Sequence, residues 1–132
     1  MAQIIVNNVQ KVFKTPGKDV IALKDINLEI KAGEFVCLLG PSGCGKSTLL
    51  NAVAGFALPS AGEITVEGRK ITGPGPDRGM VFQEYALFPW MTVAQNIAFG
   101  LEIQKKGKAE IDLTVNQLLD LLHLNDFRDR FP

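Results

Sequence analysis

The sequence predicts an α/β fold in which a buried strand leads through a glycine-rich loop into a helix. The strand is indicated by Phe35–Leu39, an uninterrupted apolar run of the kind found in parallel sheets covered on both faces. The loop follows at once, and a helix with an apolar face begins near Lys46. The 132 residues are 46% apolar and 21% charged, which suits one folded domain with a core of its own.

Two β segments are expected before the buried strand. Residues Gln3–Phe13 are rich in Ile and Val and are expected to form an edge segment. The stretch Thr15–Asp19 has the composition of a turn. Beyond it, Ile26, Leu28 and Ile30 alternate with polar residues, which predicts a strand with one buried face.

The helix after the loop is expected to span Lys46–Ala54. Gly55 is its predicted stop, because helices commonly end on a glycine in the left-handed conformation. Its predicted buried face consists of Leu49, Leu50, Val53 and Ala54.

A small antiparallel hairpin is expected next. Its strands are Glu63–Val66 and Arg69–Ile71, joined by a turn at Glu67-Gly68. Residues Gly73–Asp77 are expected to form a loop, and Met80–Phe82 another short buried strand.

The periodicity becomes helical after Gln83. Thr92 and Gln95 have the spacing of a capping box, which opens a helix. A second helix is predicted from an apolar face at helical spacing, made of Ile111, Val115, Leu118, Leu119 and Leu122.

Charge and composition exclude several functional classes. Fourteen basic residues balance fourteen acidic ones, so there is no support for a nucleic-acid or anionic-membrane surface; the cluster Lys105, Lys106 and Lys108 is expected to be a solvated turn between helices. No signal-peptide pattern and no membrane-spanning apolar run is found, so a cytoplasmic location is expected. Cys37 and Cys44 fit neither a disulfide nor a zinc pattern and are expected to be reduced.

The glycine-rich loop has the pattern G-x-x-x-x-G-K-[ST] of a phosphate-binding P-loop. Its glycines let backbone N–H groups turn toward an anion, and the helix N-terminus favours negative charge at the same place. Lys46 adds a cation for the β- and γ-phosphates, and the Ser47 hydroxyl suits Mg²⁺. We therefore expect a nucleotide-phosphate site rather than a glycine turn without a ligand; a dinucleotide-binding fold is disfavoured because G-x-G-x-x-G is absent. The predicted nucleotide-binding residues are Gly40, Pro41, Ser42, Gly43, Cys44, Gly45, Lys46, Ser47 and Thr48.

The residues around this loop resemble those of ATP-binding cassette (ABC) ATPases. Gly40–Leu50 is similar to that family's P-loop, and Val81–Glu84 is similar to its Q-loop. Leu87–Val93, followed by Asn96-Ile97, extends the resemblance toward the end of the chain. The segment Gly73–Gly79 most resembles the nitrate/sulfonate/taurine importer subfamily.

The resemblance implies a truncated P-loop NTPase of the ABC ATPase type. Residues 1–83 would form a partial nucleotide-binding core with an antiparallel β subdomain, and residues 84–132 the exit of the Q-loop and the start of the helical subdomain. The family's signature segment, acidic catalytic strand and switch histidine would follow Pro132. The chain alone is therefore expected to be inactive in hydrolysis, and aggregation-prone or only partly ordered because Phe35–Leu39 would lack a neighbouring strand.

The resemblance also implies a role for single residues. Lys46 and Gln83 would be catalytic, while Ser47 and Gln83 would contact Mg²⁺; an amide suits Gln83 because it donates and accepts hydrogen bonds. Phe13 would stack on the adenine of ATP, and the alternative is a core phenylalanine at a strand end.

Partners follow from the same resemblance. The apolar residues expected to receive a transmembrane permease subunit are Tyr85, Leu87, Phe88 and Trp90. The alternative for this segment is internal packing against the following helix. A second ATPase subunit and, indirectly, an external solute-binding protein are further implied partners, which would put the chain on the inner face of the plasma membrane.

Three functions are thus compared. The first is the ATP-binding subunit, or its N-terminal fragment, of an ABC importer. The second is a nucleotide- or partner-binding fragment without hydrolysis. The third is a fragment of a non-transport ABC ATPase or of a P-loop kinase, which the Gly73–Gly79 loop and the aromatic segment 85–91 disfavour through their resemblance.

Overall fold

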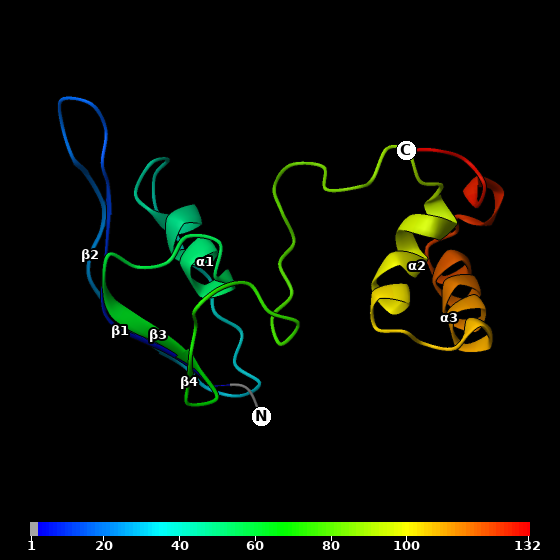
Figure 1. Cartoon of the computed structure of the whole chain (residues 1–132), viewed down its shortest axis with the longest axis horizontal. Coiled ribbons are helices and arrows are strands. Elements are labelled where there is room, and N and C mark those ends of the chain that lie inside the picture. Colours follow the sequence, from blue (N-terminus) through cyan, green and yellow to red (C-terminus); the bar gives the residue numbers. More distant parts are fainter. Residues whose placement is uncertain (1–2) are drawn as a thin grey trace. The chain divides into compact units, whose positions relative to one another are not determined.

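The computed structural model describes residues 3–132, which form two compact units, one up to Val81 and the other Phe82–Pro132. Figure 1 shows the elements of each unit. The first unit contains β1 (Ile4–Phe13), β2 (Val20–Ile30), α1 (Lys46–Ala54), β3 (Ala61–Val66) and β4 (Arg69–Lys70). The second unit contains α2 (Val93–Ile103), α3 (Lys108–Leu121) and the short 3₁₀ helix η1 (Asn125–Phe127).

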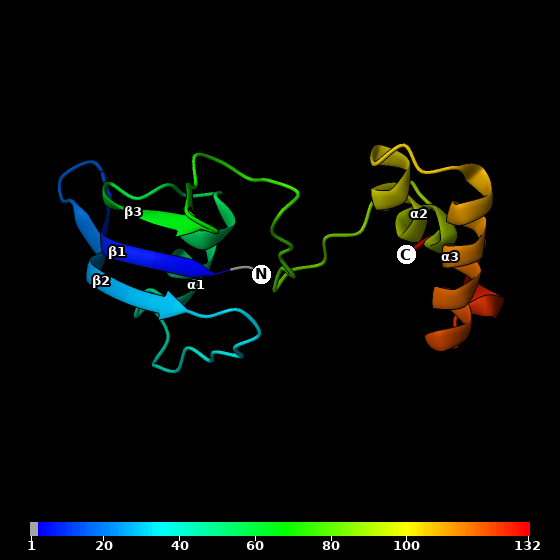
Figure 2. The ribbon, with the colours of Figure 1, turned by 90° about the horizontal axis from the view of Figure 1, so that it is seen from below.

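The first unit is an antiparallel sheet with one helix packed on it. The strand order is β2-β1-β3-β4, and each neighbouring pair is antiparallel. Figure 2 shows α1 on one side of this sheet. The helix and the strands share one core, formed by Val6, Val9, Leu23, Leu49, Ala52, Ile64, Val66 and Ile71.

The position of β1 differs from the expected one. Val6 of β1 lies opposite Leu28 of β2 and also opposite Ile64 of β3, so β1 is a central strand. The prediction that Gln3–Phe13 forms an edge segment is wrong. The reason is non-local: the hairpin made of β3 and β4 returns from beyond α1 and pairs with the free side of β1.

The β3–β4 hairpin is confirmed. Its two-residue turn has φ values of 50° at Glu67 and 73° at Gly68. Positive φ at both turn positions is the conformation whose twist matches that of antiparallel strands. The sequence places a glycine at the second of these positions, where positive φ costs least.

The bounds of α1 are also confirmed, because glycines mark both of its ends. Gly45 and Gly55 take left-handed conformations with φ values of 98° and 87°. The buried face differs in detail from the prediction: Leu49 is buried as expected, but Leu50 is exposed and Ala52 is fully buried instead.

Two predicted strands are not formed. Residues Phe35–Leu39 have no strand pairing, and Phe35 and Leu39 are 91% and 92% exposed. Met80–Phe82 likewise form no strand, and Val81 is 98% exposed. These predictions are wrong because a ladder needs a partner, and residues 3–132 provide none beside either segment.

The second unit is a pair of packed helices. Ala98 of α2 and Val115 and Leu119 of α3 form its core. The predicted capping box is confirmed, since the Thr92 hydroxyl accepts from the Gln95 N–H and the Gln95 side chain accepts from the Thr92 N–H. Leu122 was predicted on the buried face but is exposed, because α3 ends at Leu121. None of the helices within residues 3–132 has both the length and the apolar character to cross a membrane.

Candidate phosphate-binding site

The P-loop connects residue 40 to the first turn of α1. Gly43 and Gly45 have φ values of 78° and 98°, which only glycine adopts at little cost. At Gly45 there is also no room for a side chain: a Cβ atom would lie 2.6 Å from the Ala22 carbonyl oxygen and 3.1 Å from Leu23 Cδ2. The last glycine of the loop is therefore pressed against β2, which fixes where α1 begins.

The N-terminus of α1 is left without caps. Its N-cap residue, Gly45, has no side chain to accept a hydrogen bond, and no acidic residue lies in the first turn. Within residues 3–132, the first amide of α1 with a backbone partner is that of Leu49, which donates to the Gly45 carbonyl oxygen at 2.9 Å. The amides before it and the positive end of the helix dipole are available to an anion.

The start of α2 is capped by protein groups. The Val93 and Ala94 amides donate to the carbonyl oxygens of Arg130 and Arg128, at 2.9 and 3.0 Å, and the Gln95 amide donates to the Thr92 hydroxyl. The amides that open α2 are thus bonded to protein groups, whereas α1 and α3 both begin at a glycine without a side-chain cap, and of these two only α1 has no acidic residue in its first turn.

Lys46 extends over the loop it follows. Its ammonium donates to the carbonyl oxygens of Gly40 at 2.6 Å and Pro41 at 2.7 Å, and lies 3.5 Å from Cys44 Sγ. A lysine side chain ends in three donors on a flexible stem, so it can exchange these carbonyl oxygens for phosphate oxygens. The only charged residue within 40–48 is therefore a cation at the place where phosphate is expected.

Phe13 lies at the end of β1, in the same unit as the P-loop. It pairs with Val20 of β2, two residues from Ala22, against which Gly45 packs. Two residues of strand span about 7 Å, so the aromatic ring and the phosphate loop are close along β2. The ring is exposed, and Lys11 Nζ lies 5.3 Å from its centroid. The alternative that Phe13 is a core residue is therefore wrong.

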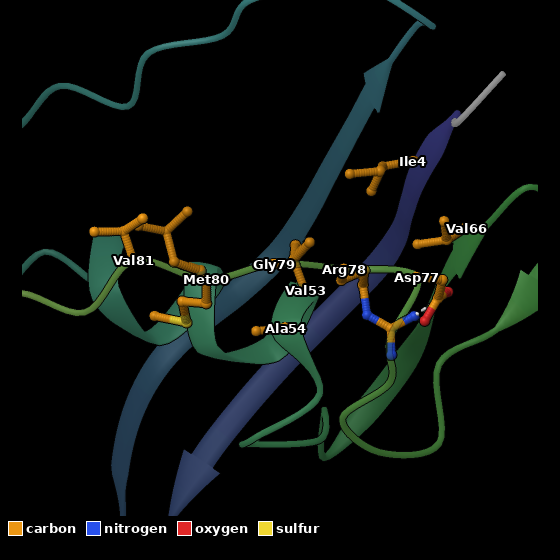
Figure 3. Close-up of a pocket in the computed structure, with 10 residues that line it drawn as sticks. Ile4, Val53, Ala54, Val66, Asp77, Arg78, Gly79, Met80 and Val81 are labelled. Atoms are coloured by element: carbon orange, nitrogen blue, oxygen red, sulfur yellow. Dashed lines mark hydrogen bonds and ion pairs between the residues drawn. The ribbon is translucent and has the colours of Figure 1, made fainter. Parts of the chain in front are cut away.

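A cavity of about 360 Å³ lies beside α1, away from the phosphate loop. Figure 3 shows Ile4 and Val66 from the strands, Val53 and Ala54 from α1, and the segment 77–81 around it. This cavity is lined by the C-terminal half of α1, whereas phosphate is expected at the N-terminus. It is therefore distinct from the candidate site.

Arg78 enters this cavity and was not singled out from the sequence. Its Nη1 donates to Asp77 Oδ2 at 2.8 Å and its Nη2 to the Gly73 carbonyl oxygen at 2.7 Å. These bonds close the loop that precedes Gln83. The sequence signal for these bonds is the pair of adjacent opposite charges, Asp77 and Arg78, after a Gly/Pro-rich stretch. Nothing in the local sequence identifies the Gly73 carbonyl oxygen as the second acceptor.

Gln83 and the aromatic segment belong to the second unit. Gln83 is exposed in a bend at the start of that unit. Tyr85, Leu87 and Trp90 are exposed, whereas Phe88 is half-buried, with its ring centroid 4.6 Å from that of Phe99. The exposed residues remain available to a partner, and Phe88 packs internally.

Comparison with known proteins decides the family. The ABC transporter family profile matches residues 23–132, which is most of the chain. The chain belongs to the ABC transporter family. The expectation drawn from the P-loop and Q-loop residues is thereby confirmed.

Relatives of this ABC chain include two import proteins. It is 50% identical to the taurine import ATP-binding protein TauB of Roseobacter denitrificans and 49% identical to the nitrate import ATP-binding protein NrtD of a Synechocystis strain. The alignments cover 98% and 96% of this chain but only 49% and 48% of the relatives. The chain thus spans about half the length of these relatives.

The fold is that of an ABC cassette. The structure superimposes on the ATP-binding cassette MJ0796, solved as a dimer bound to ADP and phosphate, with a TM-score of 0.84 and 32% identity. The match covers 98% of this ABC chain and 61% of the solved chain. The predicted fold class, an ABC ATPase fold with an antiparallel β subdomain, is confirmed for the part of the cassette that this chain spans.

Proposed function

We propose that this chain binds Mg-ATP through its P-loop and forms the nucleotide-binding part of an ABC importer subunit. The observation that carries the proposal is the uncapped start of α1, with Lys46 extended over loop carbonyls that phosphate oxygens can replace. The proposal agrees with the family, whose solved member MJ0796 was captured with ADP and phosphate.

The phosphates would be held by the backbone amides of residues 40–48 and by Lys46. Amide donors and a helix N-terminus favour an anion without needing a counter-charge on each oxygen. Lys46 would turn from the Gly40 and Pro41 carbonyl oxygens toward the β- and γ-phosphates. Phe13 would stack on adenine. It is exposed at the end of β1, close to the part of β2 that the P-loop contacts.

Mg²⁺ would be held by the Ser47 hydroxyl together with phosphate oxygens. Ser47 is exposed in the first turn of α1, where no carboxylate competes for the phosphate. When bound, the ion would supply positive charge that offsets the negative charge of the phosphates. In the assembled enzyme, Gln83 would contact Mg²⁺ as a second protein group and orient the attacking water. Lys46 would stabilise the negative charge on the transferred phosphoryl group.

The partners proposed are those of an importer. The names of TauB and NrtD describe import ATP-binding proteins. They support the proposal that this chain has a permease partner and serves the import of a small solute such as taurine or nitrate. The exposed side chains of Tyr85, Leu87 and Trp90, with Phe88 packed behind them, would contact the permease at the inner face of the membrane. The dimeric form of MJ0796 supports a second ATPase subunit, and an external solute-binding protein would act through the permease.

The test is a calorimetric titration of the chain with Mg-ATP. Charge-assisted hydrogen bonds contribute about 1.5–3 kcal/mol, so Lys46→Ala should weaken binding by roughly 10- to 150-fold. Lys70→Ala is the matched control, because Lys70 is an exposed lysine of the same unit that pairs with Glu63. The proposal fails if wild-type chain takes up no Mg-ATP, or if both lysine variants bind as tightly as the wild type.

A further inference from the structure

Asn96, in the first turn of α2, uses its whole side-chain amide to hold the loop that precedes the helix. Its Oδ1 accepts from the Phe88 N–H at 2.8 Å. Its Nδ2 donates to the carbonyl oxygens of Phe88, Met91 and Thr92, at 3.1, 3.0 and 3.0 Å. The orientation of the amide is unambiguous, because the oxygen faces an N–H group and the nitrogen faces three carbonyl groups.

These bonds are not needed to start α2. The Thr92–Gln95 capping box already satisfies amides at the helix start. The Val93 and Ala94 amides donate to carbonyl oxygens from the segment after η1. Asn96 therefore acts on the loop 88–92, not on the helix to which it belongs.

The side chains in and beside the loop 88–92 differ in exposure. The Met91 N–H donates to the Phe88 carbonyl oxygen at 3.1 Å, so the loop is a tight turn that Asn96 closes. Phe88 points toward α2, where its ring packs on Phe99. Leu87 and Trp90, on either side of Phe88, are 57% and 69% exposed.

We propose that Asn96 is a positioning residue that holds Leu87 and Trp90 outward as a preformed contact for the membrane permease. The inference rests on the proposed function, which names the permease as the partner. An apolar contact fixed before binding loses less side-chain and loop entropy on association than a mobile one. The four hydrogen bonds of Asn96 go to backbone atoms of Phe88, Met91 and Thr92, so Asn96 acts on the shape of this contact through the backbone.

Trp90 provides the experimental probe, because it is the only tryptophan of the chain. Asn96→Asp keeps the acceptor for the Phe88 N–H but replaces the donating nitrogen with an oxygen that faces three carbonyl oxygens. The added negative charge near a helix N-terminus favours α2 itself. Asn96→Ala removes all four bonds without adding charge. Gln117→Glu is the matched control, because it makes the same amide-to-carboxylate change on the exposed face of α3.

The measurement is Trp90 fluorescence anisotropy and acrylamide quenching, with far-UV circular dichroism as the measure of helicity. Both Asn96 variants should lower the anisotropy and raise the quenching constant while helicity stays at the wild-type value; Gln117→Glu should change none of these. Wild-type anisotropy in the Asn96 variants overturns the proposal. So does a loss of helicity that accompanies the fall in anisotropy, or an equal effect of Gln117→Glu. Neither nucleotide nor permease is present, so a negative result counts against Asn96 alone, whereas a failed Mg-ATP titration counts against the proposed function.

Discussion

Replacing Leu39 with serine should leave the core of the first unit unchanged, whereas the same replacement at Leu23 should disrupt it. Leu39 is 92% exposed and Leu23 is 4% exposed. Full burial of a leucine side chain stabilises a fold by about 1.5–3 kcal/mol, so the small covered part of Leu39 contributes only about 0.1–0.3 kcal/mol. At Leu23 the lost packing costs about 2–5 kcal/mol, and the buried hydroxyl adds about 1–3 kcal/mol.

Amide hydrogen exchange of β1 and β3 measures this difference directly. These strands pair with each other and carry half of the core residues, so their amides report its opening. Leu23→Ser should accelerate exchange by at least about 150-fold, because the two costs together reach at least about 3 kcal/mol and each 1.4 kcal/mol is a factor of ten. Leu39→Ser should leave exchange within about twofold of the wild type, since surface substitutions usually change stability by less than 0.5 kcal/mol.

The same two variants separate folding from association. Phe35 and Leu39 expose apolar surface on an unpaired segment, which is a site for self-association. Leu39→Ser should therefore reduce the weight-average mass in sedimentation experiments at high concentration. If Leu39→Ser instead accelerates exchange as strongly as Leu23→Ser, then Phe35–Leu39 is a buried strand in solution and not an exposed, unpaired segment.

Two further outcomes are expected for the candidate site. Phe13→Ala should weaken Mg-ATP binding by roughly 5- to 150-fold, from a stacking contribution of about 1–3 kcal/mol, and leave pyrophosphate binding unchanged; equal losses for both ligands in calorimetry contradict a contact with adenine. Gly45→Ala should accelerate amide exchange in α1 by about tenfold more than Gly43→Ala, because both glycines have positive φ but only a Cβ at Gly45 meets the Ala22 carbonyl oxygen. Indistinguishable exchange in the two variants means that the contact with β2 does not fix the start of α1.

The sequence was most informative where the determinants are local. The bounds of α1 follow from glycines at both of its ends, and the β3–β4 turn from Glu67-Gly68. The prediction of a buried strand at Phe35–Leu39 was wrong because a strand depends on a neighbour that need not be close in the sequence. The prediction that β1 is an edge strand was wrong for the same reason, since β3 pairs with β1 from beyond α1 in the sequence.

The same distinction applies to the sites. The P-loop was predictable because spacing alone puts glycines, Lys46 and a helix start together. The hydrogen bonds by which Asn96 holds the loop 88–92 could not be predicted, because an asparagine in the first turn of a helix does not reveal which carbonyl groups it binds. Arg78 and its bond to the Gly73 carbonyl oxygen were missed for the same reason.

Phosphate binding by residues 40–48 is tested most directly by an ¹H–¹⁵N correlation spectrum of the chain titrated with Mg-ATP, with pyrophosphate and with adenosine. If the P-loop holds phosphates, Mg-ATP and pyrophosphate should both shift the amide signals of residues 40–48, most strongly at the uncapped start of α1. Adenosine, which lacks phosphate, should leave those signals in place. Shifts confined to other residues, with the signals of 40–48 unmoved at saturating Mg-ATP, would mean that the P-loop does not hold the phosphates.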